Sequence, residues 1–316
     1  MKLRLRTEIE RTPLRQLIGC REGVLLLGSC FTDNVGDWMV NHWLPVMSNP
    51  WGVLFNPASI ADSLRRILSP TATTSFELHE QGGRYYSFAH HGKWSHTDAE
   101  TLQRQLIELD DEVRNFWPKV RHLFVTLGTS WVYEREGRVV ANCHKFPAGI
   151  FTRRRLSVEE IVDLWCPIIE SASDKHFIFT VSPIRHIKDG LHGNQLSKSI
   201  LLLAIDALQE RYSERVEYLP VYELLMDDLR DYRFYADDLV HPSTLAVEAV
   251  KELVTDCCFS SQTKQYMMEA MPIVKALQHR PNDPESTEYK QFLQNTLQLK
   301  DALLAKYGLA STHFEP

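Results

Sequence analysis

Two short segments carry the residue types needed for nucleophilic catalysis. Ser29 follows the apolar run Gly23 to Leu27, and a serine at a strand-to-helix turn exposes its hydroxyl near a helix N-terminus. The helix dipole favours negative charge that develops there. Asp238 and His241 lie three residues apart in a polar loop late in the chain. A carboxylate that accepts from imidazole Nδ1 leaves Nε2 able to take a proton from a serine.

These residues predict a catalytic triad in which Ser29 is the nucleophile, His241 the base and Asp238 the orienting carboxylate. Two alternatives stay open at this stage. The adjacent Asp237 is a second candidate for orienting the ring. Cys30 is a rival nucleophile, because thiolates are favoured at helix N-termini.

The elements that position these residues follow from the alternation of apolar runs with helical periodicity. Apolar runs predict five strands, at residues 23–27, 44–47, 122–127, 176–181 and 216–221. Helices are predicted at residues 33–42, 57–68, 194–212 and 243–254, and after the capping boxes at 97–100 and 157–160. The alternation predicts an α/β domain with a parallel sheet covered on both faces, whose ligand lies outside the carboxyl ends of the strands.

Two insertions interrupt this alternation and are predicted to be hairpins. They span about residues 76–96, turning at Gly82-Gly83, and about residues 131–145, turning near Gly137. The basic run at 153–155 is interpreted as a solvated segment before a helix. We therefore predict a domain at residues 1–258 and a C-terminal helical extension at 259–316. The extension is expected to contain two helices that are joined near residues 280–283. The second helix is expected to begin at Asp283-Pro284 and to end at Gly308.

Composition excludes several classes of partner. The chain of 316 residues has 35 Lys+Arg and 41 Asp+Glu, a formal charge of −6, so no basic surface is expected to attract nucleic acid or membrane lipid. The N-terminus lacks the apolar stretch of a secretory signal, which favours a cytoplasmic protein. The cysteines lack metal-site spacing, and His90, His91 and His96 are interpreted as part of a polar lid. Neither a metal nor a cofactor is therefore predicted.

Several motifs resemble one family. Gly28-Ser29-Cys30-Phe31 with Asp238-x-x-His241 resembles the GSCFA family, a branch of the SGNH (GDSL-like) hydrolases. Similar stretches are NPWG at 49–52, GTSWVY at 128–133, NCHK at 142–145, and SPIRH at 182–186 through LSK at 196–198. Together they cover about residues 20–256 and leave out the C-terminal helices. The resemblance implies a three-layer α/β/α sandwich with a five-stranded parallel sheet and a flavodoxin-like arrangement. It implies the same triad of Ser29, His241 and Asp238.

The resemblance also implies an oxyanion hole built from three donors. Ser29 and Gly52 match the positions of two backbone N–H donors. The third position departs from the superfamily pattern, because Ser130 stands where that pattern has an asparagine. Loss of one such donor costs about 10²–10³ in rate. Three alternatives for the third donor stay open. The hydroxyl of Ser130 or Thr129 donates, the side chain of Asn142 donates from the second hairpin, or hydrolysis is weak.

Substrate-binding residues are predicted around this site. Arg185 and His186 follow the fourth strand and suit an anionic or sugar-like group, and His144 and Trp131 lie on the second hairpin. The favoured hypothesis is an esterase acting on an O-acyl group, such as an acetyl group on a carbohydrate. An O-acyltransferase with the same nucleophile and a catalytically degenerate binding module are the alternatives. The C-terminal helices pack on the core or join two copies in a homo-oligomer.

Overall fold

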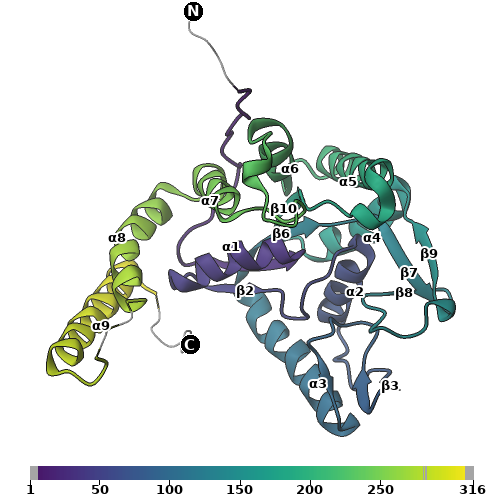
Figure 1. Cartoon of the computed structure of the whole chain (residues 1–316), viewed down its shortest axis with the longest axis horizontal. Coiled ribbons are helices and arrows are strands. Elements are labelled where there is room, and N and C mark those ends of the chain that lie inside the picture. The colour runs from purple at the N-terminus through teal and green to yellow at the C-terminus, as the bar shows by residue number, and fades with distance from the viewer. Residues whose placement is uncertain (1–5, 280, 282, 310–316) are drawn as a thin grey trace, which may run out of the picture.

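A five-stranded parallel sheet forms the centre of the computed structural model, which describes residues 6–279, 281 and 283–309. Its strands lie in the order β11-β10-β6-β1-β2 (Figure 1). Their bounds are β1 Gly23–Gly28, β2 Val46–Ser48, β6 Val120–Leu127, β10 His176–Val181 and β11 Val216–Tyr218. All neighbouring pairs are parallel, which confirms the prediction from sequence. The carboxyl ends of these strands therefore share one edge of the sheet.

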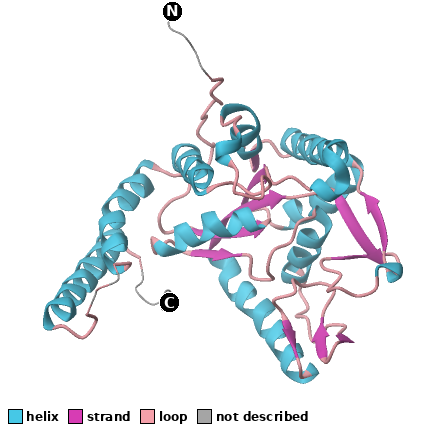
Figure 2. Ribbon diagram, in the orientation of Figure 1, coloured by secondary structure: helices cyan, strands magenta, loops and turns pink. Residues whose placement is uncertain are grey.

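Helices cover both faces of this sheet (Figure 2). Side chains alternate along β1, so that Val24 and Leu26 join the core beneath α1 and α7, whereas Leu25 and Leu27 join the core beneath α2, α4 and α5. The sheet is thus the middle of three layers. The helices are α1 Cys30–Asn41, α2 Pro57–Leu68, α3 Ala99–Phe116, α4 Val158–Ser171, α5 Gly190–Arg211, α6 Val221–Glu223, α7 Thr244–Cys258, α8 Ser261–Leu277 and α9 Thr287–Tyr307.

The two predicted capping boxes had different outcomes. At α4 the Ser157 hydroxyl accepts from the N–H of Glu160, and the Glu160 carboxylate accepts from the N–H of Ser157, which confirms that box. At α3 the box at Thr97 does not form. Asp98 caps the helix instead by accepting from the N–H of Thr101, because the helix begins one residue later than the box requires.

The two insertions form small antiparallel sheets beside the main one. The first contains β3 His79–Gln81, β4 Arg84–Tyr86 and β5 Ser95–His96, and its first two strands turn at Gly82-Gly83 as predicted. The second contains β7 Trp131–Arg135, β8 Arg138–Val140 and β9 Thr152–Arg155. The basic run at 153–155 therefore lies in a strand, which corrects its interpretation as a solvated segment. Two of its charges are paired with carboxylates, since Arg153 contacts Asp189 and Arg154 contacts Glu134 and Glu160.

The C-terminal helices α8 and α9 extend from the body beyond α7 (Figure 1). They pack on the core of this same chain, since Tyr266 is fully buried and its hydroxyl donates to the carbonyl of His42 over 2.6 Å. Ser286 caps α9, so the helix begins later than the Asp283-Pro284 pair predicted, and Gly308 ends it with a φ of 68° as expected. Arg280 and Asn282, at the predicted joint, lie outside the described residues. Across the described ranges, the helices fall short of the length and apolar character needed to cross a bilayer.

Candidate active site

Ser29 is placed at the sheet edge by the turn between β1 and α1. It occupies the N-cap position with φ −71° and ψ 166°, yet its side chain does not cap the helix. Gly28 makes this turn possible, because its φ is 138° and a Cβ there would lie 2.1 Å from the Thr126 carbonyl oxygen. Ser29 is 1% exposed, and its hydroxyl has no hydrogen-bond partner among the described residues. A buried, uncommitted hydroxyl at a helix N-terminus is therefore available for chemistry.

Asp238 and His241 are brought together by a closed loop. Tyr235 and Pro242 form an antiparallel bridge, and Ala236 N–H donates to the His241 carbonyl over 2.8 Å. Asp238 Oδ1 accepts from the N–H groups of Val240 and His241, each over 2.9 Å. Its Oδ2 lies 2.6 Å from His241 Nδ1. The spacing of three residues thus gives the carboxylate–imidazole pair that the sequence predicted.

The ionisation of Asp238 fixes the state of the histidine ring. Hydrogen bonds from the backbone N–H of His241, from its ring and from the N–H of Val240 lower the pKa of Asp238 to about 2. An ionised carboxylate only accepts, so Nδ1 of His241 carries the proton at neutral pH. In the neutral ring Nε2 then keeps its lone pair, as a general base requires.

Ser29 and His241 line the same cavity, of about 910 Å³. Asp238 is outside the set of described residues that line the cavity, and no hydrogen bond joins Ser29 to His241 among those the described residues make. The His241 side chain is 52% exposed, which leaves its ring free to approach the serine. The cavity wall is rich in aromatic side chains, namely Phe55, Trp131, Tyr133, Phe146 and Phe151.

The N–H of Gly52, a predicted oxyanion donor, is already used in a turn. Its N–H donates to the Asn49 carbonyl over 2.8 Å in a tight turn, and it is outside the set of described residues that line the cavity. Its φ is 83°, and a Cβ would lie 2.3 Å from the Cβ of His91. The positive φ of the turn and the close packing of His91 therefore explain why residue 52 is a glycine. The Ser29 N–H, the other predicted donor, lies 3.3 Å from the Thr126 carbonyl oxygen.

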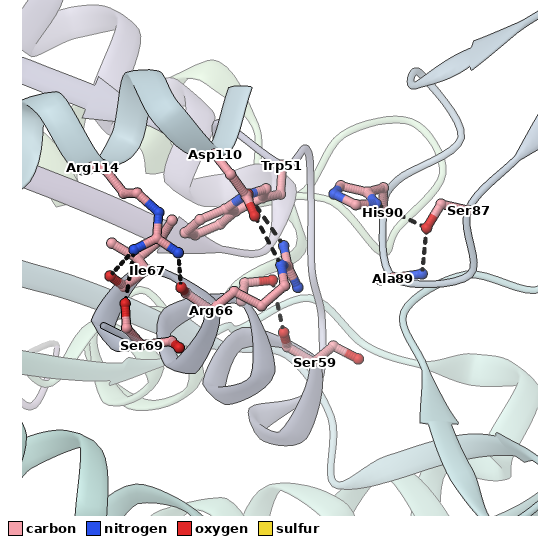
Figure 3. A network of polar contacts seen from close by, with 11 residues as sticks. Trp51, Ser59, Arg66, Ile67, Ser69, Ser87, Ala89, His90, Asp110 and Arg114 are labelled. Carbon is pink, nitrogen blue, oxygen red and sulfur yellow. Dashed lines mark hydrogen bonds and ion pairs between the residues drawn. The ribbon is translucent and has the colours of Figure 1, made fainter. Parts of the chain in front are cut away.

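The residue of this turn that contacts the end of β1 is Asn49. Its Oδ1 accepts from the N–H of Gly28 over 2.8 Å, and its Nδ2 donates to Asp33 in α1 over 2.6 Å. The next residue but one, Trp51, is fully buried and donates to Asp110 over 2.7 Å. Arg66 pairs with the same carboxylate over 3.1 Å (Figure 3). Asn49 therefore holds the segment after β2 against β1 and α1, whereas Trp51 holds it against α3.

Ser130 is also turned away from the cavity. It is fully buried, and its hydroxyl donates to Ser197 of α5 over 3.1 Å. Thr129 does line the cavity, but its hydroxyl lies 3.0 Å from that of Ser197 and accepts from the N–H of Trp131. Asn142 lines the cavity with its Oδ1 held by the N–H of His144, and its Nδ2 makes no hydrogen bond to the described residues. Asn142 thus has a donor group without a hydrogen bond to the described residues, whereas the hydroxyls of Thr129 and Ser130 both contact Ser197.

Comparison with models of known protein families shows to which family this chain belongs. Residues 23–253 match the model of the GSCFA family. The chain belongs to the GSCFA family. A second match, described as the GSCFA domain protein, C-terminal domain, covers residues 270–312. It includes the end of α8 and all of α9, which the sequence motifs did not reach.

Other comparisons add little to this GSCFA assignment. Curated proteins give no match. A solved structure described as "The structure of a putative platelet activating factor from Streptococcus pneumonia" is similar over 75% of this chain and 83% of that chain. It has 12% sequence identity and a TM-score of 0.36.

Three of the four predicted substrate-binding residues line the cavity of this GSCFA protein. Arg185 lies over the ring of Tyr235 at 4.6 Å and donates to its hydroxyl over 2.9 Å. His186 faces the cavity, and burial followed by the charge of Lys198 lowers its pKa to about 4. Trp131 lines the cavity under the guanidinium of Arg153, 4.2 Å from its ring centre. His186 is therefore neutral near pH 7.

His144 has a different place from that predicted. It is 8% exposed, its Nε2–H donates to the Ser87 carbonyl over 2.8 Å, and its ring centre lies 4.9 Å from that of Tyr86. Because that carbonyl only accepts, Nε2 carries the proton. Burial lowers the pKa of this ring. His144 thus joins the two small sheets rather than lining the cavity. The described residues contain no cluster of three or more His, Cys, Asp or Glu able to hold a metal ion.

Lys198, noted in the sequence only as part of the LSK stretch, also belongs to this edge. Its Nζ donates to the carbonyls of Gly128 and Ser182, which follow β6 and β10. The signal was present in the helical spacing of α5, because Lys198 falls on the stripe of Leu201 and Ile205 that faces the core. A lysine on a buried stripe requires a partner or a function.

Proposed function

We propose that this GSCFA protein is a serine-dependent, esterase-like hydrolase that acts on O-acyl esters through an acyl-enzyme on Ser29. The observation that carries the proposal is the arrangement in one cavity of an uncommitted, buried Ser29 hydroxyl and a His241 ring oriented by Asp238. A nucleophile, a base and a group that orients the base are the parts that acyl transfer needs.

The reaction follows from these positions. On substrate binding, His241 Nε2 takes the proton of Ser29, and Oγ forms a bond to the ester carbonyl carbon. The tetrahedral intermediate then expels the alcohol, which receives the proton from His241. A water molecule, deprotonated in turn by His241, attacks the acyl-serine and releases the carboxylic acid and free Ser29.

The developing oxyanion requires donors that the ground state leaves available. The N-terminus of α1 supplies a positive potential beside Ser29. We assign the side-chain donor to Asn142, because the hydroxyls of Thr129 and Ser130 are held by Ser197. The Ser29 N–H is a further donor, since its 3.3 Å contact with Thr126 is long for an N–H to oxygen hydrogen bond.

The cavity wall supports a sugar ester as the substrate. Trp131, Tyr133 and Phe151 offer flat apolar faces of the kind that bind a sugar ring, and Arg185 offers a planar guanidinium for an oxygen-rich group. A volume of about 910 Å³ accommodates an acyl group together with its alcohol. The same space would let a second alcohol replace water, and the protein would then be an O-acyltransferase.

The topology supports an SGNH-type assignment. The nucleophile follows the first strand of the sheet, and the Asp-x-x-His loop precedes the last helix of the α/β unit. This order matches the SGNH pattern that the motifs resemble.

Labelling with a fluorophosphonate tests the proposal, with peptide mass spectrometry to locate the adduct. The wild-type protein should be labelled at Ser29, and Ser29→Ala and His241→Ala should abolish the reaction. Cys30→Ala should still be labelled, which separates the two candidate nucleophiles. An unlabelled wild-type protein, or an adduct at another residue, would overturn the assignment and favour a binding module. Acceptor alcohols that divert the product from free acid would identify a transferase.

A further inference from the structure

Lys198 is the most deeply buried cation beside the site. Its side chain is fully buried, and its Nζ donates to the Gly128 carbonyl over 2.5 Å and to the Ser182 carbonyl over 2.6 Å. Neither partner is charged, and no carboxylate of the described residues forms an ion pair with it. Burying a charge without a counter-ion is costly, and chains retain such groups mostly where function needs them.

The carbonyls that Lys198 holds belong to the two loops beside the nucleophile. Gly128 and Thr129 both donate their N–H groups to the Phe55 carbonyl, over 2.8 and 3.1 Å. Leu54 in turn donates to the carbonyl of Gly28, directly before Ser29. Lys198 is thus the start of a continuous series of hydrogen bonds that runs from β6 through the segment after β2 to the turn of Ser29.

Lys198 acts together with the residue before it in α5. The Ser197 hydroxyl accepts from the N–H of Ser130 over 2.8 Å and contacts the hydroxyls of Thr129 and Ser130. This Ser197-Lys198 pair therefore fixes both the peptide groups and the side chains of the loop at 128–130. Trp131, which lines the cavity, follows that loop directly.

We propose that Lys198 is a positioning residue for the reaction at Ser29: it holds the Gly128 and Ser182 carbonyls in place, and its charge favours negative charge in the cavity. The inference rests on the proposed acyl transfer, because an oxyanion is the charge that this field would stabilise. Lys198 acts through the loops and the local potential, without contact to the substrate.

The groups that face Lys198 leave its charge largely unopposed. The loop after β10 contributes His186, whose pKa the charge of Lys198 lowers, and Asp189, which pairs with Arg153 of β9. Arg185 of the same loop points to Tyr235. Burial lowers the pKa of Lys198 to about 7. Its ammonium group is therefore lost as the pH rises above about 7.

The test compares the rate of fluorophosphonate labelling of Ser29 against pH in three full-length variants. Wild type should decline in rate above pH 7, whereas Lys198→Met should react about 10–100-fold more slowly at pH 6.5 and should lack that decline. Lys198→Arg keeps a charge at every pH, so it should react faster than Lys198→Met, also without the alkaline decline. Lys175→Met is the matched control, because Lys175 is also buried but lies at the amino end of β10, paired with Asp174.

A second readout separates this proposal from the proposed function. The indole N–H resonance of Trp131, assigned by its loss in Trp131→Phe, should shift between pH 6 and 8 in wild type and Lys175→Met but not in Lys198→Met. Wild type that is never labelled at Ser29 would overturn the hydrolase and with it the catalytic role of Lys198, and the indole titration would then decide only whether the charge of Lys198 reaches the cavity. A Lys198→Met protein with the labelling profile and indole titration of wild type would overturn the role of Lys198 alone.

Discussion

Nδ1 of His241 lies 2.6 Å from Oδ2 of Asp238, and the same carboxylate accepts two backbone N–H groups of its own loop. This geometry makes Asp238, rather than its neighbour Asp237, the group that orients the base. All of these contacts lie within residues 238–241, so this part of the loop forms the carboxylate–imidazole pair by itself. The relationship therefore separates two aspartates that the sequence could not distinguish.

Asp238→Asn should lower the rate of Ser29 acylation by about 10³–10⁴-fold, because an amide leaves the wrong nitrogen of His241 protonated. The melting temperature should change little, since the Asp238 side chain is 51% exposed. Asp237→Asn is the matched control and should keep the wild-type rate. Labelling kinetics for both variants measure the difference. Equal losses in the two variants would show that the loop, rather than the carboxylate, matters.

Local sequence patterns predicted the parallel sheet and the residues at its carboxyl edge. The alternation of strands and helices is enough to place the strand ends, without knowledge of side-chain contacts between distant residues. The placing of Ser29 and the Asp238–His241 pair follows from that edge. The orientation of Gly52 and Ser130 could not be predicted, since it depends on distant partners, His91 and Ser197. Strand β9 was missed for a similar reason, because the carboxylates that pair with Arg153 and Arg154 lie on other elements.

Asp110→Asn should lower the free energy of unfolding by about 3–5 kcal/mol. Asp110 is 1% exposed and holds both Arg66 and the indole of Trp51, so its loss leaves a largely buried guanidinium unpaired (Figure 3). Asp111→Asn, at the exposed next position, should change stability by less than about 0.5 kcal/mol. Urea unfolding of both variants provides the comparison. A small effect at Asp110 would mean that the segment after β2 is held by packing alone.

Acid should destabilise the protein in part through His90. This ring is fully buried against Ser87, and burial lowers its pKa from 6.5 to about 3. Between those values the unfolded chain binds one more proton, so stability falls as the pH drops from about 6.5 to 3, by about 1.4 kcal/mol per pH unit. His90→Gln should flatten this slope by about one proton. Thermal unfolding from pH 7 to 4 measures it, with His192→Gln as the exposed control. An unchanged slope would contradict the assignment to His90.

Gly28→Ala should destabilise the fold and displace Ser29. A Cβ would lie 2.1 Å from a backbone oxygen, and the φ of 138° is itself unfavourable for alanine, so we expect a loss of at least about 3 kcal/mol. Gly82→Ala is the control, because its φ of 62° is also positive but the space around it is open. That variant should lose about 1–2 kcal/mol. Chemical denaturation would measure both, and similar losses would show that the contact with Thr126 is relieved by a small shift.

Asn142 is expected to supply the side-chain donor to the oxyanion, and substitution tests this against the alternative at Thr129. Asn142→Ala should lower the acylation rate about 10²–10³-fold with little change in the affinity for substrate, because the bond forms only in the transition state. Thr129→Val should lose far less, since the Thr129 hydroxyl is already held by Ser197 and by the N–H of Trp131. Steady-state kinetics on a chromogenic acetyl ester would separate kcat from KM. A larger loss in Thr129→Val would transfer the role to Thr129, and the hydroxyl would then have to leave Ser197 during the reaction.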